Sequence, residues 1–345
     1  MRKLFVAIVL LVSMCAVTFF TTLVFAKAEA DKPIVLKLST FGPPVGATEK
    51  ILQQWADMIG EKSGGRVKID CYYGGALAKA ADTRSSMEHG VFDIGFVPNT
   101  ETPSLVPASL ILETPMMGFT GSRMATNVWG ELLKTNPIVQ KDFSNVKVLM
   151  AWMANGRFIH STKKAIRTPE DIKGVKVLAW GTAANAVELL GGAPLQQPPP
   201  DWYASLDRGL AEGIVTAPFL VSLFKIDPVL HYHTYGVDLG YAGLALLMNR
   251  DSWGKLPTDV QDLIENELNP WAVEEMVKID ERAQIGIQRA WEKKGHAIIK
   301  ITPEEIRLWN QALQPLHEEL IKKYEAKGIP AGELFKQIKL MIKNY

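Results

Sequence analysis

The 345-residue sequence predicts an α/β fold with two lobes. Segments rich in β-branched residues alternate with segments of helical periodicity, which is the pattern of α/β layers built on parallel sheets. A mature chain of ~315 residues, left after loss of an N-terminal signal, exceeds the size at which a single core usually stops growing. Only Cys71 then remains, so no intramolecular disulfide can form and the two cores must supply the stability.

The N-terminus has the pattern of a secretory signal peptide. Two basic residues precede an apolar stretch from Leu4 to Ala26, and small residues stand at signal-peptidase spacing near its end. We expect residues 1–28 to be a signal peptide, with cleavage after Ala26, Ala28 or Ala30, and the mature protein to lie in the periplasm. An uncleaved membrane anchor is the alternative, because the stretch is long enough to span a bilayer.

The first half of the mature chain alternates strands and helices. In its first helix Ile51, Trp55 and Ile59 fall on one face, and Gly64-Gly65 end the helical pattern. The same reasoning predicts strands at 34–41, 66–73, 92–97 and 146–154, and helices at 47–62, 79–89 and 122–134.

A second set of elements follows Asn155. Thr168 is a helix N-cap, with Pro169 in the first helical position and two acidic residues behind it. The pattern predicts strands at 158–162, 174–181, 214–217 and 243–249, a one-turn helix from Thr168, and helices at 182–190 and 200–208.

The last third of the chain is almost entirely helical. We expect one helix over 258–294 with a kink at Pro270, and another over 302–327 that begins with the cap signal TPEE. Neither a repeat nor a low-complexity linker separates the halves, so the chain should cross between the lobes more than once. The expected boundaries are lobe I at 32–154 plus about 244–282, lobe II at 155–243 plus about 283–335, and a C-terminal helix end at 336–345.

Charge and motifs exclude several functions. Removing the two basic residues of the signal from 38 leaves 36 basic against 37 acidic residues, a net charge of −1, so we expect no nucleic-acid partner. Nucleophile elbows, phosphate-binding glycine loops and paired CxxC motifs are missing from the sequence, so we expect neither an enzyme nor a cofactor. His231 and His233 alternate on a strand without a third ligand, so we expect no metal site.

Five segments, in this order and spacing, resemble the DctP-like solute-binding proteins of tripartite ATP-independent periplasmic (TRAP) transporters: EKSGGRVKID, ALAKAADTRSSMEHGVFDIGF, IRTPEDIKGVKV, WYASLDRGLAEG and MNRDSWGKLPTDVQDLI. The resemblance implies a two-lobed, class II-like periplasmic-binding-protein fold with a long helix spanning both lobes. It also implies a small organic ligand enclosed by lobe closure, a small and a large permease subunit as membrane partners, and a monomer.

The sequence departs from this family in its candidate pocket. Members usually carry an arginine at the position of Leu178, where it holds the ligand's carboxylate in a bidentate pair. Phe41, Pro98, Phe158 and Thr216 also stand where relatives have polar or larger contacts. A buried carboxylate without a partner costs several kcal/mol, so we expect a ligand with aromatic or aliphatic bulk against a wall of Leu178 and Trp180.

One basic residue remains near this pocket. Arg157 either binds a carboxylate by a different route or forms a surface salt bridge, and the sequence does not decide between them. The candidate ligand-binding residues are Phe41, Asn99, Trp152, Arg157, Phe158, Leu178, Trp180, Pro199, Thr216 and Phe219.

The sequence therefore predicts an extracytoplasmic binding protein that delivers an organic acid with apolar bulk to a TRAP permease. Two alternatives remain open at this point. One is the ligand-sensing periplasmic input of a signalling system built on the same fold, and the other is an extracytoplasmic enzyme.

Overall fold

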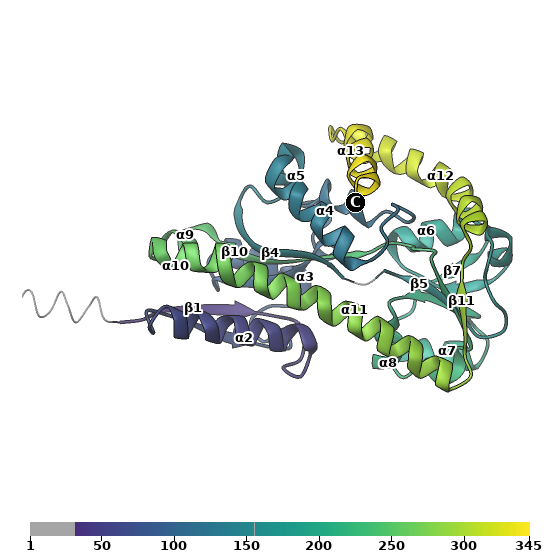
Figure 1. Cartoon of the computed structure of the whole chain (residues 1–345), viewed down its shortest axis with the longest axis horizontal. Coiled ribbons are helices and arrows are strands. Elements are labelled where there is room, and N and C mark those ends of the chain that lie inside the picture. The colour runs from purple at the N-terminus through teal and green to yellow at the C-terminus, as the bar shows by residue number, and fades with distance from the viewer. Residues whose placement is uncertain (1–31, 155) are drawn as a thin grey trace, which may run out of the picture.

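The computed structural model describes residues 32–154 and 156–345, so the predicted signal peptide lies outside the described residues. Two sheets, each covered by helices, form two α/β lobes (Figure 1). The predicted α/β class and the predicted long helix spanning both lobes are confirmed. Among the described helices, none is long and apolar enough to cross a membrane.

The first sheet has five strands in the order β2-β1-β3-β10-β4. Their bounds are β1 Ile34–Ser39, β2 Val67–Tyr72, β3 Ile94–Pro98, β4 Val146–Ala154 and β10 Ala242–Asn249. β10 runs antiparallel to both of its neighbours, so the prediction of a parallel sheet is wrong here. β10 is antiparallel because the chain comes directly from the second sheet and enters the first sheet at the edge where β3 and β4 end.

The second sheet has six strands in the order β11-β9-β5-β8-β6-β7. Their bounds are β5 Phe158–Ser161, β6 Lys176–Leu178, β7 Ala193–Leu195, β8 Gly213–Thr216, β9 Tyr232–Tyr235 and β11 Ala297–Lys300. β5 is antiparallel to β8 and β9, again against the prediction. Only residues 155–157 separate β4 from β5, so β5 must start at the edge that faces the first sheet.

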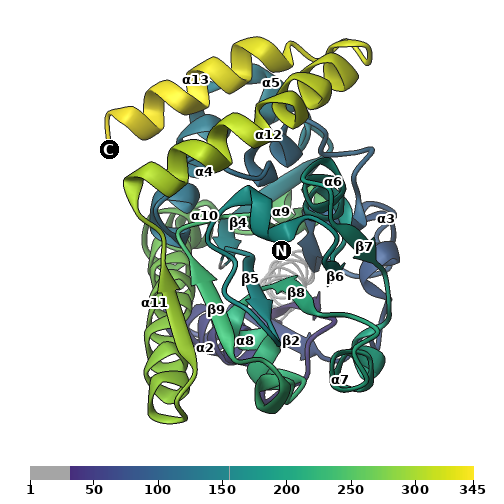
Figure 2. The same cartoon turned by 90° about the vertical axis from the view of Figure 1, so that its right-hand side faces the viewer.

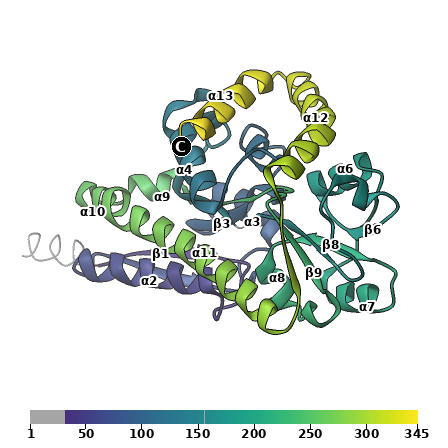
Figure 3. The same ribbon diagram turned by 45° about the vertical axis from the view of Figure 1, so that its right-hand side comes forward.

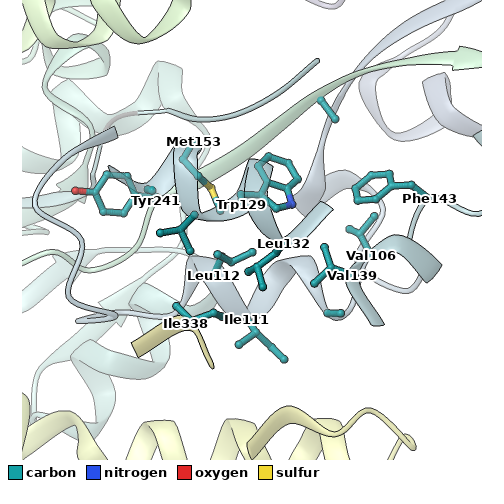
Figure 4. Close-up of a cluster of buried hydrophobic side chains, with 14 of the residues drawn as sticks. Val106, Ile111, Leu112, Trp129, Leu132, Val139, Phe143, Met153, Tyr241 and Ile338 are labelled. Carbon is teal, nitrogen blue, oxygen red and sulfur yellow. The ribbon is translucent and has the colours of Figure 1, made fainter. Parts of the chain in front are cut away.

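Helices cover both faces of the first sheet: α2 Ala47–Lys62, α3 Ala80–Glu88, α4 Ser122–Thr135, α5 Pro137–Lys141 and α9 Arg250–Gly254. The predicted face of α2 is confirmed, since Ile51, Trp55 and Ile59 are all buried in one core cluster. The opposite face of the sheet has its own cluster, which contains Trp129 and Leu132 of α4 and also Ile338 (Figure 4).

The second lobe carries the helices α6 Gly181–Leu189, α7 Trp202–Asp207, α8 Pro218–Leu223 and α12 Pro303–Glu325. The predicted cap at Thr168 forms a capping box with Asp171. The predicted strand 174–181 is limited to Lys176–Leu178, because the chain turns into α6 at Gly181 with a positive φ of 56°.

The long helical segment is α10 Thr258–Leu263, a π-helical turn at Ile264–Leu268 and α11 Asn269–Lys293. The π turn ends just before Pro270, where wider backbone spacing accommodates a ring that cannot donate a hydrogen bond. Met276 of α11 is buried in the first lobe and Trp291 in the second, so one helix joins both cores (Figures 1 and 3).

The C-terminal helix α13 Ala331–Lys343 crosses back over the first lobe (Figure 2). Its Leu334, Phe335 and Ile338 are buried in the cluster around Trp129, whereas Leu313 of α12 belongs to the second lobe. The lobe boundaries given above stay predictions, and α13 as a whole packs with lobe I.

Candidate functional site

The edges of the two sheets meet at the hinge. β4 passes to β5 through residues 155–157, and β9 returns to β10 through residues 236–241. These short crossings set the carboxyl ends of β1, β3 and β4 opposite those of β6, β7 and β8. In open α/β sheets ligands bind beyond such ends. Nine of the ten predicted ligand-binding residues lie at these ends, in the crossings, or in the first turn that follows, and Phe158 begins β5 directly after a crossing.

The first lobe presents a stack of three aromatic rings at this edge. Phe41 stacks on Phe96, with ring centroids 4.9 Å apart and planes 19° apart, and Phe96 stacks on Trp152 at 5.3 Å and 14°. Trp152 and Phe96 are each 2% exposed, whereas Phe41 is 39% exposed. Phe41 is therefore the outer ring that a ligand could meet, and Trp152 supports it from below.

The second lobe presents a matching aromatic group. Trp180 packs on Trp202 with ring centroids 5.1 Å apart, and Trp202 packs on Phe224 at 4.9 Å. The indole N–H of Trp202 donates to the carbonyl of Gln197 at 2.9 Å, which fixes the central ring. Trp180 is half-buried and, with predicted Pro199, lines an open pocket of about 420 Å³.

Three predicted residues lie beneath the edge rather than on it. Leu178 is fully covered in a cluster that also holds Phe158 and Trp202, and Trp180 packs against the same cluster. Thr216 is 3% exposed and pairs with Phe158 across the sheet. A direct contact of these side chains with a ligand stays a prediction. Phe219, in the first turn of α8, is 40% exposed.

Two buried acids lie at the hinge. Glu113, which ends the short helix Ser109–Glu113, accepts a hydrogen bond from the Gly243 amide at 3.0 Å. Burial raises the pKa of Glu113 to about 7, although the Arg157 charge, the Gly243 N–H and the Asn99 amide pull that pKa down. Burial likewise raises the pKa of Asp238 to about 7, against the Gly240 N–H and the Arg157 charge.

Arg157 thus faces both acids, and Asn99 faces Glu113. Asn99 is 1% exposed and its amide lies against Gly243, so it belongs to the interior of the hinge. Arg157 is half-buried, and none of the ion pairs within the described ranges includes it. Among the described residues, Arg157 therefore does not form the surface salt bridge that was one of its two predicted roles. A role for Arg157 in holding a carboxylate stays a prediction.

A chain of histidines runs inward from the surface to Thr216. His296 Nδ1 lies 3.0 Å from His233 Nε2, His233 Nδ1 lies 2.9 Å from His160 Nδ1, and His160 Nε2 lies 3.2 Å from the Thr216 carbonyl. Burial lowers the pKa of His160 to about 4, so that ring is neutral at pH 7. Because the carbonyl can only accept, His160 donates from Nε2 and accepts from His233.

Sequence reasoning found His233 but not its partners, because β5 and β11 bring them from distant segments. Within residues 32–154 and 156–345, no group of three or more His, Cys, Asp or Glu side chains could hold a metal ion. Sequence reasoning also missed Phe96, Phe224, Glu113 and Asp238. Phe96 carried one usable signal, since it lies near the end of the predicted strand 92–97.

The comparison with known families decides the class of this protein. Residues 39–324 match the bacterial extracellular solute-binding proteins, family 7. The chain belongs to this family. The C4-dicarboxylate-binding periplasmic protein DctP of Rhodobacter capsulatus is 23% identical to this family 7 protein over 311 residues, which cover 87% of this chain and 90% of the relative.

Solved structures share the fold of this chain. A TRAP periplasmic solute-binding protein from Desulfovibrio salexigens superimposes with a TM-score of 0.82 at 24% identity, covering 91% of this chain and 97% of that one. A TRAP solute-binding protein from Rhodoferax ferrireducens, in complex with copurified benzoate, gives a TM-score of 0.77 at 21% identity, covering 90% and 98%. This chain is thus a bacterial extracellular solute-binding protein of family 7, with the fold of the TRAP periplasmic solute-binding proteins.

Proposed function

We propose that this protein captures an aromatic carboxylic acid in the periplasm and delivers it to the small and large membrane subunits of a TRAP permease. The observation that carries the proposal is the pair of aromatic groups at the facing edges, which end in Phe41 on one lobe and Trp180 on the other. Aromatic pairs contribute about 0.5–1.5 kcal/mol each beyond the area they bury. An aromatic ligand ring enclosed between the two lobes would gain this energy at Phe41 and again at Trp180, whereas an aliphatic acid would gain it at neither.

The residue at position 178 supports the same ligand class. Leu178 is fully buried where the resembled family has its carboxylate-binding arginine, so the second lobe offers apolar packing in place of a guanidinium fork. The benzoate found with the Rhodoferax ferrireducens protein shows that the fold accommodates such acids in that relative. At 21% identity that relative shares the fold with this chain, and the ligand class of this chain follows from its own aromatic residues.

Arg157 is our proposed partner for the ligand's carboxylate. The pKa values of Glu113 and Asp238 lie near 7, so at neutral pH each acid is protonated in a large fraction of molecules. The Arg157 charge is then only partly balanced from the protein side. A carboxylate that enters during lobe closure would complete the balance, and hinge closure around a ligand is the ordinary motion of such two-lobed proteins.

The test is a calorimetric titration with benzoate and with cyclohexanecarboxylate, which share charge and ring size but differ in aromaticity. We expect benzoate to bind more tightly, and Trp180→Ala to weaken benzoate by about tenfold, the equivalent of about 1.4 kcal/mol. Tyr345→Ala, which removes a 63% exposed ring on the C-terminal segment, is the control and should have no effect. Equal affinity for the two acids in the wild type would refute the aromatic assignment.

A further inference from the structure

The turn that carries Phe41 rests on a buried carboxylate. Glu49, in the first turn of α2, is 5% exposed, and its Oε1 accepts a hydrogen bond from the Thr40 hydroxyl at 3.1 Å. The Thr40 hydroxyl in turn accepts from the Gly42 amide at 3.2 Å. One carboxylate and one hydroxyl therefore fix the backbone on both sides of Phe41.

The glycines of this turn show how closely the backbone lies on Glu49. A Cβ at Gly42 would stand 1.7 Å from Glu49 Oε1, and a Cβ at Gly46 would stand 2.1 Å from Oε2. The carbonyl of Gly42 also accepts from the Gly74 amide at 2.8 Å, which ties the turn to the one after β2. Only residues without a side chain fit against the carboxylate at these two positions.

Burying the Glu49 carboxylate at this place costs stability, so we infer that it does more than fill space. Burial raises the pKa of Glu49, because the charged form loses water that the Thr40 hydroxyl replaces only in part. A leucine or alanine would fill the same place on α2 without that cost. The carboxylate gives what an apolar side chain cannot, a directed hydrogen bond that fixes the turn.

We propose that Thr40 is a positioning residue, whose hydroxyl is held by the Glu49 carboxylate and in turn holds Phe41 flat on Phe96, and so sets the preference for aromatic over aliphatic acids. The proposal rests on the proposed function. Its geometric basis is the 19° angle between the rings of Phe41 and Phe96, which leaves the outer face of Phe41 parallel to the stack and available to a ligand ring. A turn free to rotate would lose that orientation and with it the gain from stacking.

The first experiment is a double-mutant cycle between Thr40 and Phe41, read by titration with benzoate and cyclohexanecarboxylate. Thr40 is 1% exposed, and Thr40→Val keeps its shape but removes the hydroxyl. Thr40→Ser keeps the hydroxyl and is the matched control. We expect Thr40→Val to weaken benzoate about fivefold, the effect of one lost hydrogen bond, and to leave cyclohexanecarboxylate unchanged. In a Phe41→Ala background Thr40→Val should have no further effect. An equal loss for both acids, or a loss that persists without Phe41, overturns the proposal.

A second measurement needs no ligand and separates this proposal from the proposed function. Hydrogen exchange of the ligand-free protein should be faster across residues 41–46 in Thr40→Val than in Thr40→Ser, because the Gly42 amide loses its acceptor. Unchanged exchange would overturn the positioning role even if benzoate binds. If instead the wild type does not prefer benzoate while exchange responds as expected, the assigned ligand class is wrong and the hydrogen bond that holds the turn stands.

Discussion

Replacing Glu113 with glutamine should stabilise the protein at alkaline pH and leave it nearly unchanged in mild acid. Burial raises the pKa of this carboxyl from 4.5 to about 7, so the folded state resists its ionisation. Below pH 4.5 the folded and unfolded states both hold the proton, and the residue has no pH-linked effect. Between pH 4.5 and 7 the unfolded chain releases the proton first, and stability falls as the pH rises. Above pH 7 the folded state carries the full free-energy cost of the buried Glu113 charge.

The size of this penalty follows from the shift. About 2.5 pH units at 1.36 kcal/mol each give about 3.4 kcal/mol, which Glu113→Gln should recover at pH 8.5 but not at pH 4.5. Glutamine keeps a carbonyl oxygen for the Gly243 amide, so that hydrogen bond survives. The assay is urea unfolding of both proteins at the two pH values, with exposed Glu131→Gln as the control. A difference between wild type and variant that is the same at both pH values would refute the reasoning.

Three further predictions follow from the same structure. Burial lowers the pKa of His160 from 6.5 to about 4, so acidification from pH 6.5 to 4 should cost the wild type about 3 kcal/mol of stability. His160→Gln should reduce that loss in urea unfolding, and equal acid sensitivity of the two proteins would contradict the prediction. Gly243→Ala would place a Cβ 2.1 Å from the Asn99 amide nitrogen and should lower the melting temperature. Gly130→Ala, which has open space around it, should not lower it, and calorimetry that ranks the two variants the other way would disprove the prediction. N-terminal sequencing of the exported protein should begin between Lys27 and Asp31, and a protein that still starts at Met1 would rule out cleavage.

The sequence predicted what depends on local pattern. The buried face of α2 followed from helical spacing, and the edge positions of Phe41 and Trp180 followed from where strands end. Strand direction did not follow, because a period of two residues is the same in parallel and antiparallel sheets. The antiparallel course of β5 and β10 became visible only with the short crossings at the hinge.

The parts of the site that could not be predicted depend on contacts between distant segments. Phe41, Phe96 and Trp152 come from the turn after β1, from β3 and from β4, and their spacing in the sequence does not predict one stack. Glu113 and Asp238 have the same letters as surface acids, so their burial and raised pKa values are invisible until the chain is folded. These are effects of tertiary environment, which single-sequence patterns do not carry.

The return of α13 to the first lobe bears on how the protein is made. The core around Trp129 is completed by Phe335 and Ile338, which follow the strands of the second sheet and α12 along the chain. The first lobe thus lacks part of its interior until the chain has been made through Ile338. The second lobe, whose sheet and α12 end before α13, has all of its core residues earlier. Synthesis from the N-terminus therefore supplies the last core residues of the second lobe before those of the first lobe.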